Sequence, residues 1–157
     1  MNKLKFPLNQ NDFNKFSKIK DNQHFYLSGF LYVMRDRAHK LYIENNENVI
    51  DFENSAIFYA GPTDSGVFGP TTSARMDPYT EYFAEKGVKL FIGKGNRDNK
   101  LLETLRNNYD ARYAVTFGGL ASYLTKCVIS SEVLLFPDLG CEAIYKIEVK
   151  NLPVIFI

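Results

Sequence analysis

Hydrophobic and polar positions form blocks along this chain, and the blocks predict strands and helices in turn. Residues 25–34 are rich in strand-forming side chains, with an interruption at Ser28 and Gly29. Residues 35–45 are polar with scattered apolar positions and indicate a helix. Short apolar runs predict the remaining strands, which are 55–60, 88–92, 113–117, 133–136, 143–149 and 154–157.

Turn and capping residues predict two further helices between these strands. Asp77 is a candidate N-cap, Pro78 suits the first helical position, and Gly87 suits the left-handed position after a last turn. We therefore expect a helix over 78–86. Asp98 can begin the second helix, whose apolar stripe is Leu101, Leu102, Leu105 and Tyr109.

The alternation of strands and helices, with strand-rich ends, predicts an α/β domain with a mixed, partly parallel sheet. Glycine-containing turns at Gly61, Gly93 and Gly118 each follow a predicted strand. In parallel α/β sheets, ligands collect at the carboxyl ends of the strands. We therefore expect a site near these turns.

The N-terminal residues are expected to differ from the rest of the chain. Residues 1–20 are predicted to be loosely structured, so we place a lead-in over 1–24 and the domain over 25–157. We expect the apolar side chains of the lead-in to pack against either the domain or a partner. These side chains are Phe6, Leu8, Phe13 and Phe16.

Composition excludes several classes of protein. A chain of 157 residues with 45% hydrophobic and 24% charged residues is typical of one globular domain. A net charge of +1 with dispersed lysines predicts no nucleic-acid surface. The absence of an 18-residue apolar run and of a signal-like N-terminus predicts a cytoplasmic protein that does not span a membrane.

The cysteines and histidines give no metal-binding pattern. Cys127 and Cys141 are expected to be free thiols, and two cysteines are fewer than an iron–sulfur cluster usually requires. His24 and His39 are far apart in the sequence. A metal centre that takes part in the function must therefore belong to another chain.

The strongest candidate site is the segment 69–77. It combines a glycine–proline turn, the hydroxyls of Thr71, Thr72 and Ser73, and the guanidinium of Arg75, directly before a helix N-terminus. These groups suit a carboxylate or a phosphate. A capped helix with a surface arginine explains the same residues, and spacing alone favours the site only slightly.

Three weaker segments accompany it. Lys94 lies between two glycines at a strand end, where it can reach a cleft or simply occupy a turn. The segment 35–40 holds four potential cations beside Asp36, although a solvated helix start is the commoner explanation. Asp138 and Glu142 could serve acid–base chemistry, but a tight turn is the preferred interpretation of 136–143.

The order of these segments resembles the C-terminal domain of class I fumarate hydratases, also found as the β subunit of two-chain fumarases and L-tartrate dehydratases. The resemblance covers roughly residues 25–157. Two departures are a short connection between Thr63 and Gly69 and Cys141 where methionine is common. The segments that carry the resemblance are 35–40, 59–63, 69–77, 93–95, 118–119, 136–143 and 146–149.

The resemblance implies a swivelling β/β/α domain that closes over a site shared with a larger α subunit, as a heterodimer or α2β2 assembly. That partner would hold a [4Fe-4S] cluster on three cysteines, with one iron open to a dicarboxylate substrate. Thr71 would be the catalytic base, and Arg75 and Lys94 would be catalytic and bind substrate carboxylates. The remaining implied substrate-binding residues are Arg35, Thr72 and the accessory His39.

The implied reaction is the reversible hydration of fumarate to L-malate. An L(+)-tartrate dehydratase β subunit is the alternative within the class, and no residue of this chain distinguishes the two substrates. A phosphate- or nucleotide-binding module is a different alternative, which the absence of a P-loop and of a dinucleotide fingerprint disfavours. A noncatalytic assembly domain is the third, and it leaves the three cationic segments without a purpose.

Overall fold

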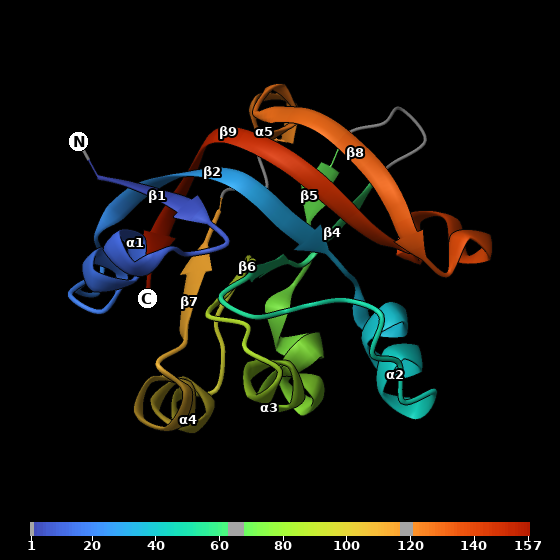
Figure 1. Ribbon diagram of the computed structural model, residues 1–157, viewed down its shortest axis with the longest axis horizontal. Helices are drawn as coiled ribbons and strands as arrows, with labels where there is room; N and C mark the ends of the chain where they lie inside the picture. The colour runs from blue at the N-terminus through green and yellow to red at the C-terminus, as the bar shows by residue number, and fades with distance from the viewer. Residues whose placement is uncertain (1, 63–67, 117–120) are drawn as a thin grey trace.

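The strands of the protein form two layers, and a layer of helices covers one of them (Figure 1). The computed structural model describes residues 2–62, 68–116 and 121–157. The first layer contains β1 (Lys3–Phe6), β2 (His24–Val33), β8 (Val128–Leu135) and β9 (Ile144–Phe156). The middle layer contains β3 (Ala56–Phe58), β6 (Leu90–Gly93) and β7 (Arg112–Val115), and beneath it lie α2 (Asp36–Glu44), α3 (Asp77–Glu85) and α4 (Asn99–Tyr109).

Strand pairing links the two β layers into one sheet of seven strands. Its order is β1-β2-β3-β6-β7-β9-β8, and β2 also pairs with β9. The β2–β3, β3–β6 and β6–β7 pairs are parallel, whereas β9 is antiparallel to β2, β7 and β8. The predicted α/β fold with a mixed, partly parallel sheet is confirmed.

The middle strands are buried on both faces, and their alternation separates two cores. Ala56 and Phe58 of β3 face the core between the two β layers. Ile57 and the following Tyr59 face the core between the middle layer and the helices. Because both faces are covered, the strand is a continuous apolar run rather than an alternating one. Because β3, β6 and β7 run parallel, their carboxyl ends lie at the same edge of the sheet.

Shorter elements complete the fold. They are α1 (Gln10–Phe16), β4 (Ala60–Pro62), β5 (Phe68–Pro70), the 3-10 helix η1 (Ser73–Met76), α5 (Ala121–Lys126) and the 3-10 helix η3 (Pro137–Glu142). β4 and β5 pair antiparallel. η3 occupies the segment where a tight turn was preferred. The predicted helix after Asp98 is confirmed as α4.

Two predictions about the ends of the chain are wrong. Residues 1–20 are not loosely structured, because β1 pairs parallel with β2 and places Leu4 and Phe6 in the core. The two strands predicted over 143–149 and 154–157 are one strand, β9. A register shift opposite Leu27 and Gly29, with Asn151 at φ 54°, bends β9 there instead of ending it.

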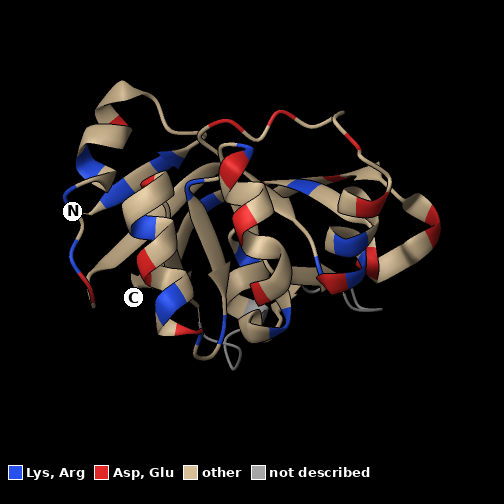
Figure 2. Cartoon of the chain, turned by 90° about the horizontal axis from the view of Figure 1, so that it is seen from below, with Lys and Arg blue, Asp and Glu red and all other residues tan. Residues whose placement is uncertain are grey.

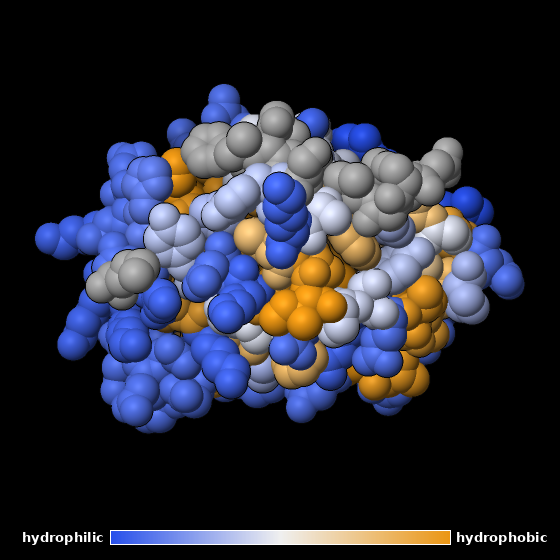
Figure 3. Space-filling view, turned by 90° about the horizontal axis from the view of Figure 1, so that it is seen from above, coloured by the Kyte–Doolittle hydropathy of each residue, from blue (hydrophilic) through white to orange (hydrophobic). Residues whose placement is uncertain are grey.

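The outer surfaces differ in chemistry. Basic and acidic residues are interspersed on the helical side (Figure 2). The opposite side shows patches of apolar residues among polar ones (Figure 3). Exposed apolar side chains of β2 and β8 include Phe30, Ile129, Val133 and Leu134. Among the described residues, no helix is both long enough and apolar enough to cross a bilayer.

Phe6→Ala tests whether the N-terminal segment stabilises the domain. The Phe6 ring is fully buried and contacts the edge of Phe16 at a centroid distance of 6.5 Å. We expect a loss of about 3–5 kcal/mol in the free energy of unfolding, measured by urea denaturation. The exposed neighbour Lys5 provides the control, and Lys5→Ala should cost less than about 0.5 kcal/mol. Equal losses in the two variants would contradict the packing role.

Candidate functional site

Backbone hydrogen bonds hold the segment 69–77 at the carboxyl ends of two parallel strands. The Thr71 N–H donates to the carbonyl of Tyr59, directly after β3, at 2.6 Å. The Ser73 N–H donates to the carbonyl of Lys94, directly after β6, at 3.0 Å. Thr72 and Lys94 form an isolated parallel bridge. The segment therefore lies at the edge of the sheet where a site was expected.

The helix after this segment begins earlier than predicted. The 3-10 turn of η1 starts at Ser73 and runs directly into α3. Asp77 is the first residue of α3 rather than its N-cap, and its carboxylate accepts a hydrogen bond from Arg97 Nε at 2.7 Å. The predictions for Pro78 and Gly87 are confirmed, since Pro78 lies in the first turn and Gly87 has φ 107°.

An ion pair joins this segment to the start of α2. Arg75 Nη2 lies 2.8 Å from Asp36 Oδ1, and both side chains are partly exposed. Burial favours a higher pKa for Asp36, but the hydrogen bond and the charge of Arg75 outweigh it and hold that pKa below its ordinary value. The carboxylate consequently stays charged and fixes the direction of Arg75.

Arg35 is held against η3. Its Nη1 donates to Cys141 Sγ at 3.5 Å, and a Cβ at Gly61 would lie 2.8 Å from Arg35 Cδ and 2.4 Å from the Cys141 carbonyl. Glycine is therefore required at position 61 for this close approach. Arg35 Nε is buried and has no hydrogen-bond partner among the described residues, so it retains a donor.

These contacts bring the predicted site residues into one connected cluster. The 69–77 segment contacts Lys94 through its backbone and the 35–40 segment through Arg75. Lys94 and Thr72 are exposed, and Thr71 is half-buried. Cations beside hydroxyl groups can bind carboxylates and stabilise negative charge that develops on them.

His39 lies beneath this cluster. It is fully buried among the rings of Tyr59, Tyr79 and Phe83, and its Nδ1 is 2.7 Å from the carbonyl of Arg35. Burial lowers its pKa to about 4, so the ring is neutral at pH 7. Its Nε2 has no partner among the described residues. In this structure His39 supports Arg35 from below and does not reach the surface.

Sequence reasoning missed one residue of this region, Arg97. It is 7% exposed and binds Asp77, Tyr59 and Thr80 through hydrogen bonds. The only sequence signal is its position three residues after Lys94, in the same turn. A charged residue in a polar turn is usually exposed, so the burial of Arg97 could not be predicted from its sequence position.

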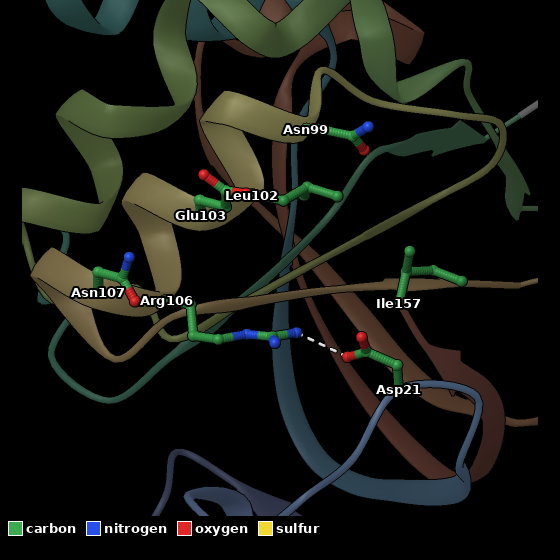
Figure 4. Close-up of a pocket in the computed structure, with 7 residues that line it drawn as sticks. All are labelled: Asp21, Asn99, Leu102, Glu103, Arg106, Asn107 and Ile157. Carbon is green, nitrogen blue, oxygen red and sulfur yellow. Dashed lines mark hydrogen bonds and ion pairs between the residues drawn. The ribbon is translucent and has the colours of Figure 1, made fainter.

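A hollow elsewhere on the chain contains none of the predicted site residues. It has a volume of about 510 Å³ and lies between α4 and the C-terminal residue (Figure 4). Its lining includes the ion pair of Arg106 and Asp21, whose atoms are 2.6 Å apart. The lining sets Arg106 against two carboxylates, Asp21 and Glu103, so this hollow has no net positive charge, whereas the cluster has Arg35, Arg75 and Lys94 beside Asp36.

The described residues of this chain offer no ligand set for a metal cluster. In the ranges that the structure describes, no group of three His, Cys, Asp or Glu side chains could hold a metal ion. Cys127 is buried and Cys141 is exposed, and both are free thiols.

Two further predicted segments fall partly or wholly outside the described residues, at Thr63 and at Gly118 and Gly119.

The sequence pattern of the family described as Fumarase C-terminus matches residues 2–157. This chain belongs to the Fumarase C-terminus family. The family resemblance inferred from the ordered segments is therefore confirmed, and the match extends through β1 and α1, which the predicted resemblance left out.

Three relatives show how this fumarase C-terminal domain is used elsewhere. It is 38% identical to fumarate hydratase 2 of Leishmania major over 139 residues, or 81% of this chain and 24% of the relative. It is 36% identical to the aerobic class I fumarate hydratase of Escherichia coli K12, and the match covers 81% of this chain and 25% of the relative. It is 36% identical over 159 residues to a putative L(+)-tartrate dehydratase subunit beta of Methanocaldococcus jannaschii. This match covers 88% of this chain and 81% of the relative.

The coverage differs between these relatives. The chain spans about a quarter of the length of the fumarate hydratases that it matches, which carry the matching segment within a longer polypeptide. It spans most of the tartrate dehydratase subunit. The relatives are hydro-lyases by name, so the family is one of lyases.

His39→Phe tests the burial of the neutral ring in this fumarase C-terminal domain. The unfolded chain binds a proton at His39 below about pH 6.5, whereas the folded chain resists it down to about pH 4. Stability should therefore fall as pH decreases through this window, by about 3 kcal/mol from His39 alone. His39→Phe should remove that part of the loss, as urea denaturation at pH 7 and pH 4.5 will measure. Parallel pH profiles for the two proteins would contradict this.

Proposed function

We propose that this chain is the β subunit of a two-chain hydro-lyase that reversibly hydrates fumarate to L-malate. The observation that carries the proposal is the contact of the 69–77 segment with both Lys94 and the 35–36 segment. A dicarboxylate needs a cationic group for each of its two ends, and this cluster supplies Arg35, Arg75 and Lys94 from three separate segments. A capped surface helix would not require this arrangement.

Each residue of the cluster has a chemical role in the proposal. In the dehydration direction, Thr71 accepts the proton from the carbon next to a substrate carboxylate. Negative charge then spreads onto that carboxylate, and Arg75 and Lys94 stabilise it. The C–O bond of the neighbouring carbon breaks as the double bond forms, and the iron–sulfur cluster of the proposed α subunit would act as the Lewis acid for the departing hydroxyl group. A threonine hydroxyl is a weak base, so the role requires cations nearby. Thr72 positions the substrate, Arg35 binds its second carboxylate, and His39 is accessory through its contact with Arg35.

The remaining part of the proposed enzyme lies in an α subunit. The family resemblance implies a [4Fe-4S] cluster, and we infer that this partner carries it, since two cysteines in this chain cannot supply its ligands. The tartrate dehydratase relative is named as a subunit, and the fumarate hydratase relatives are about four times as long as the matching segment. Two free thiols support a cytoplasmic location.

A second candidate is the β subunit of an L(+)-tartrate dehydratase. The observation that favours it is coverage, since the match spans 81% of the Methanocaldococcus jannaschii subunit. The deciding experiment is co-expression with a three-cysteine α partner, anaerobic reconstitution, and assays on fumarate, L-malate and L-tartrate. Turnover of tartrate alone would replace the fumarase proposal. Turnover by this chain without a partner would overturn the subunit role.

Thr71→Ala tests the proposed base. The variant should fold and still bind the α subunit, because the Thr71 contact with Tyr59 uses the backbone N–H. We expect kcat to fall by at least about a hundredfold, as is typical when a general base is lost. Thr71→Ser retains a hydroxyl and should keep much more activity. A kcat near that of the wild type in Thr71→Ala would refute the assignment.

Lys94→Ala tests the proposed carboxylate contact. Its ammonium group lies on an exposed residue directly after β6, so its removal leaves the core intact. We expect kcat/KM to fall at least about tenfold, which corresponds to roughly 1.4 kcal/mol. The exposed Lys100 of α4 provides a control of equal charge, and Lys100→Ala should leave kcat/KM unchanged. Equal values for the two variants would remove Lys94 from the site.

A further inference from the structure

Arg97 carries a buried charge directly behind the candidate site. Its side chain is fully buried in the ion pair with Asp77, whose own side chain is 26% exposed. Its Nε donates to Asp77 Oδ1 at 2.7 Å and its Nη1 to the Tyr59 hydroxyl at 3.1 Å, while Nη2 donates to Thr80 Oγ1. All three nitrogens of the guanidinium group therefore have partners.

Two aromatic rings enclose the same group. The Arg97 guanidinium carbon lies 5.2 Å from the ring centroids of both Tyr59 and Tyr113. Burial opposes the charge, but Tyr59 and Asp77 more than compensate and raise the pKa of Arg97 above its ordinary value. The residue thus remains a cation within an apolar core.

Stability alone is a weak reason for such an arrangement. The desolvation cost of a buried ion pair often equals or exceeds its Coulombic gain, so well-packed apolar residues can be as stable. A buried, fully bonded cation does impose one geometry on its partners, because each hydrogen bond has a required direction. The identity of the partners therefore indicates what Arg97 fixes.

Each partner of Arg97 lies in the 69–77 segment or contacts it. The Thr80 hydroxyl donates to the carbonyl of Met76 at 2.8 Å. The Tyr59 carbonyl accepts the hydrogen bond from the Thr71 N–H. The Tyr113 hydroxyl lies 2.8 Å from Ser73 Oγ and 2.8 Å from the Gly95 carbonyl. Asp77 directly follows the 3-10 turn of η1.

Close packing leaves this region little freedom to adjust. A Cβ at Gly93 would lie 1.9 Å from Ser73 Oγ and 3.0 Å from the Tyr59 ring. The segment 71–73 therefore rests directly on the end of β6. A shift of Tyr59 or Asp77 would be transmitted to the segment, because no space between them can absorb it.

We propose that Arg97 is a positioning residue that holds Thr71 and Lys94 in their relative places without contacting the substrate. Its role in turnover rests on the proposed function, whereas its role in ordering the segment does not. Lysine cannot replace it, because an ammonium group lacks the planar fork that reaches Asp77, Tyr59 and Thr80 together.

Arg112 provides a matched control. It is 8% exposed, lies over the Phe156 ring at 5.6 Å, and donates to Asp21 at 2.8 Å and to the Ile19 carbonyl at 2.6 Å. It opens β7, at the amino end of the parallel strands, whereas Arg97 follows the carboxyl end of β6. The two arginines thus share burial, an aromatic neighbour and hydrogen bonds from both terminal nitrogens, but they lie at opposite edges, and Arg112 Nε has no partner among the described residues.

Amide hydrogen exchange of the full chain tests the ordering role without any assay of activity. Arg97→Lys should accelerate exchange of the Thr71 and Ser73 amides at least about tenfold, and Arg112→Lys should leave these two amides unchanged. If Arg97→Lys does not fold, Tyr59→Phe removes one hydroxyl partner of Arg97, keeps the ring, and should accelerate the same amides. Unchanged exchange at Thr71 and Ser73 in a folded variant overturns the proposal.

Steady-state kinetics of the reconstituted two-chain enzyme test the role in turnover. Arg97→Lys should lower kcat at least about tenfold and change KM by less than about threefold, at a temperature where both variants are folded. Arg112→Lys should retain the wild-type kcat. If the role of Arg97 were purely structural, Arg97→Lys would retain the wild-type kcat as well. An inactive wild-type enzyme on fumarate, malate and tartrate would refute the proposed function, and the exchange result would still decide the ordering role.

Discussion

The candidate site depends on two backbone hydrogen bonds, from Thr71 to Tyr59 and from Ser73 to Lys94. They attach a short polar segment to the ends of β3 and β6, which are parallel neighbours in the sheet. Backbone groups make these bonds, so they leave the side-chain hydroxyl of Thr71 and the ammonium of Lys94 available for other contacts. Parallel pairing places both strand ends at one edge, and the site is a consequence of that topology.

The two-sided burial of the middle strands explains why polar side chains gather at this edge. Ile57, Phe91 and Tyr113 pack against the helices, while the residues adjacent to them in each strand pack against the other β layer. A strand buried on both faces has no room for functional side chains along its length. The chain can present such groups only where the strands end.

Sequence reasoning succeeded where the signal is local. Gly87 and Pro78 were predicted correctly because a left-handed backbone and a first helical turn each depend on one residue. It failed where the outcome depends on distant partners. Residues 1–20 were expected to be loosely structured, yet β1 pairs with β2 and buries Leu4 and Phe6. Asp77 was expected to cap a helix, yet its carboxylate accepts a hydrogen bond from Arg97. The candidate site residues were selected from local motifs and from the family resemblance, but their mutual contacts required the tertiary structure.

Arg97 and His39 show two different ways of accommodating an ionisable group beneath the same surface. His39 loses its charge, because the cost of burial outweighs the hydrogen bond to the carbonyl of Arg35, which favours the charged form. Arg97 keeps its charge, because an arginine is not readily deprotonated and three side chains satisfy its nitrogens. The neutral histidine therefore adds no positive charge beneath Arg35, and the charge of Arg97 is buried and paired with Asp77. The cations of the cluster are therefore Arg35, Arg75 and Lys94, of which Arg75 is paired with Asp36.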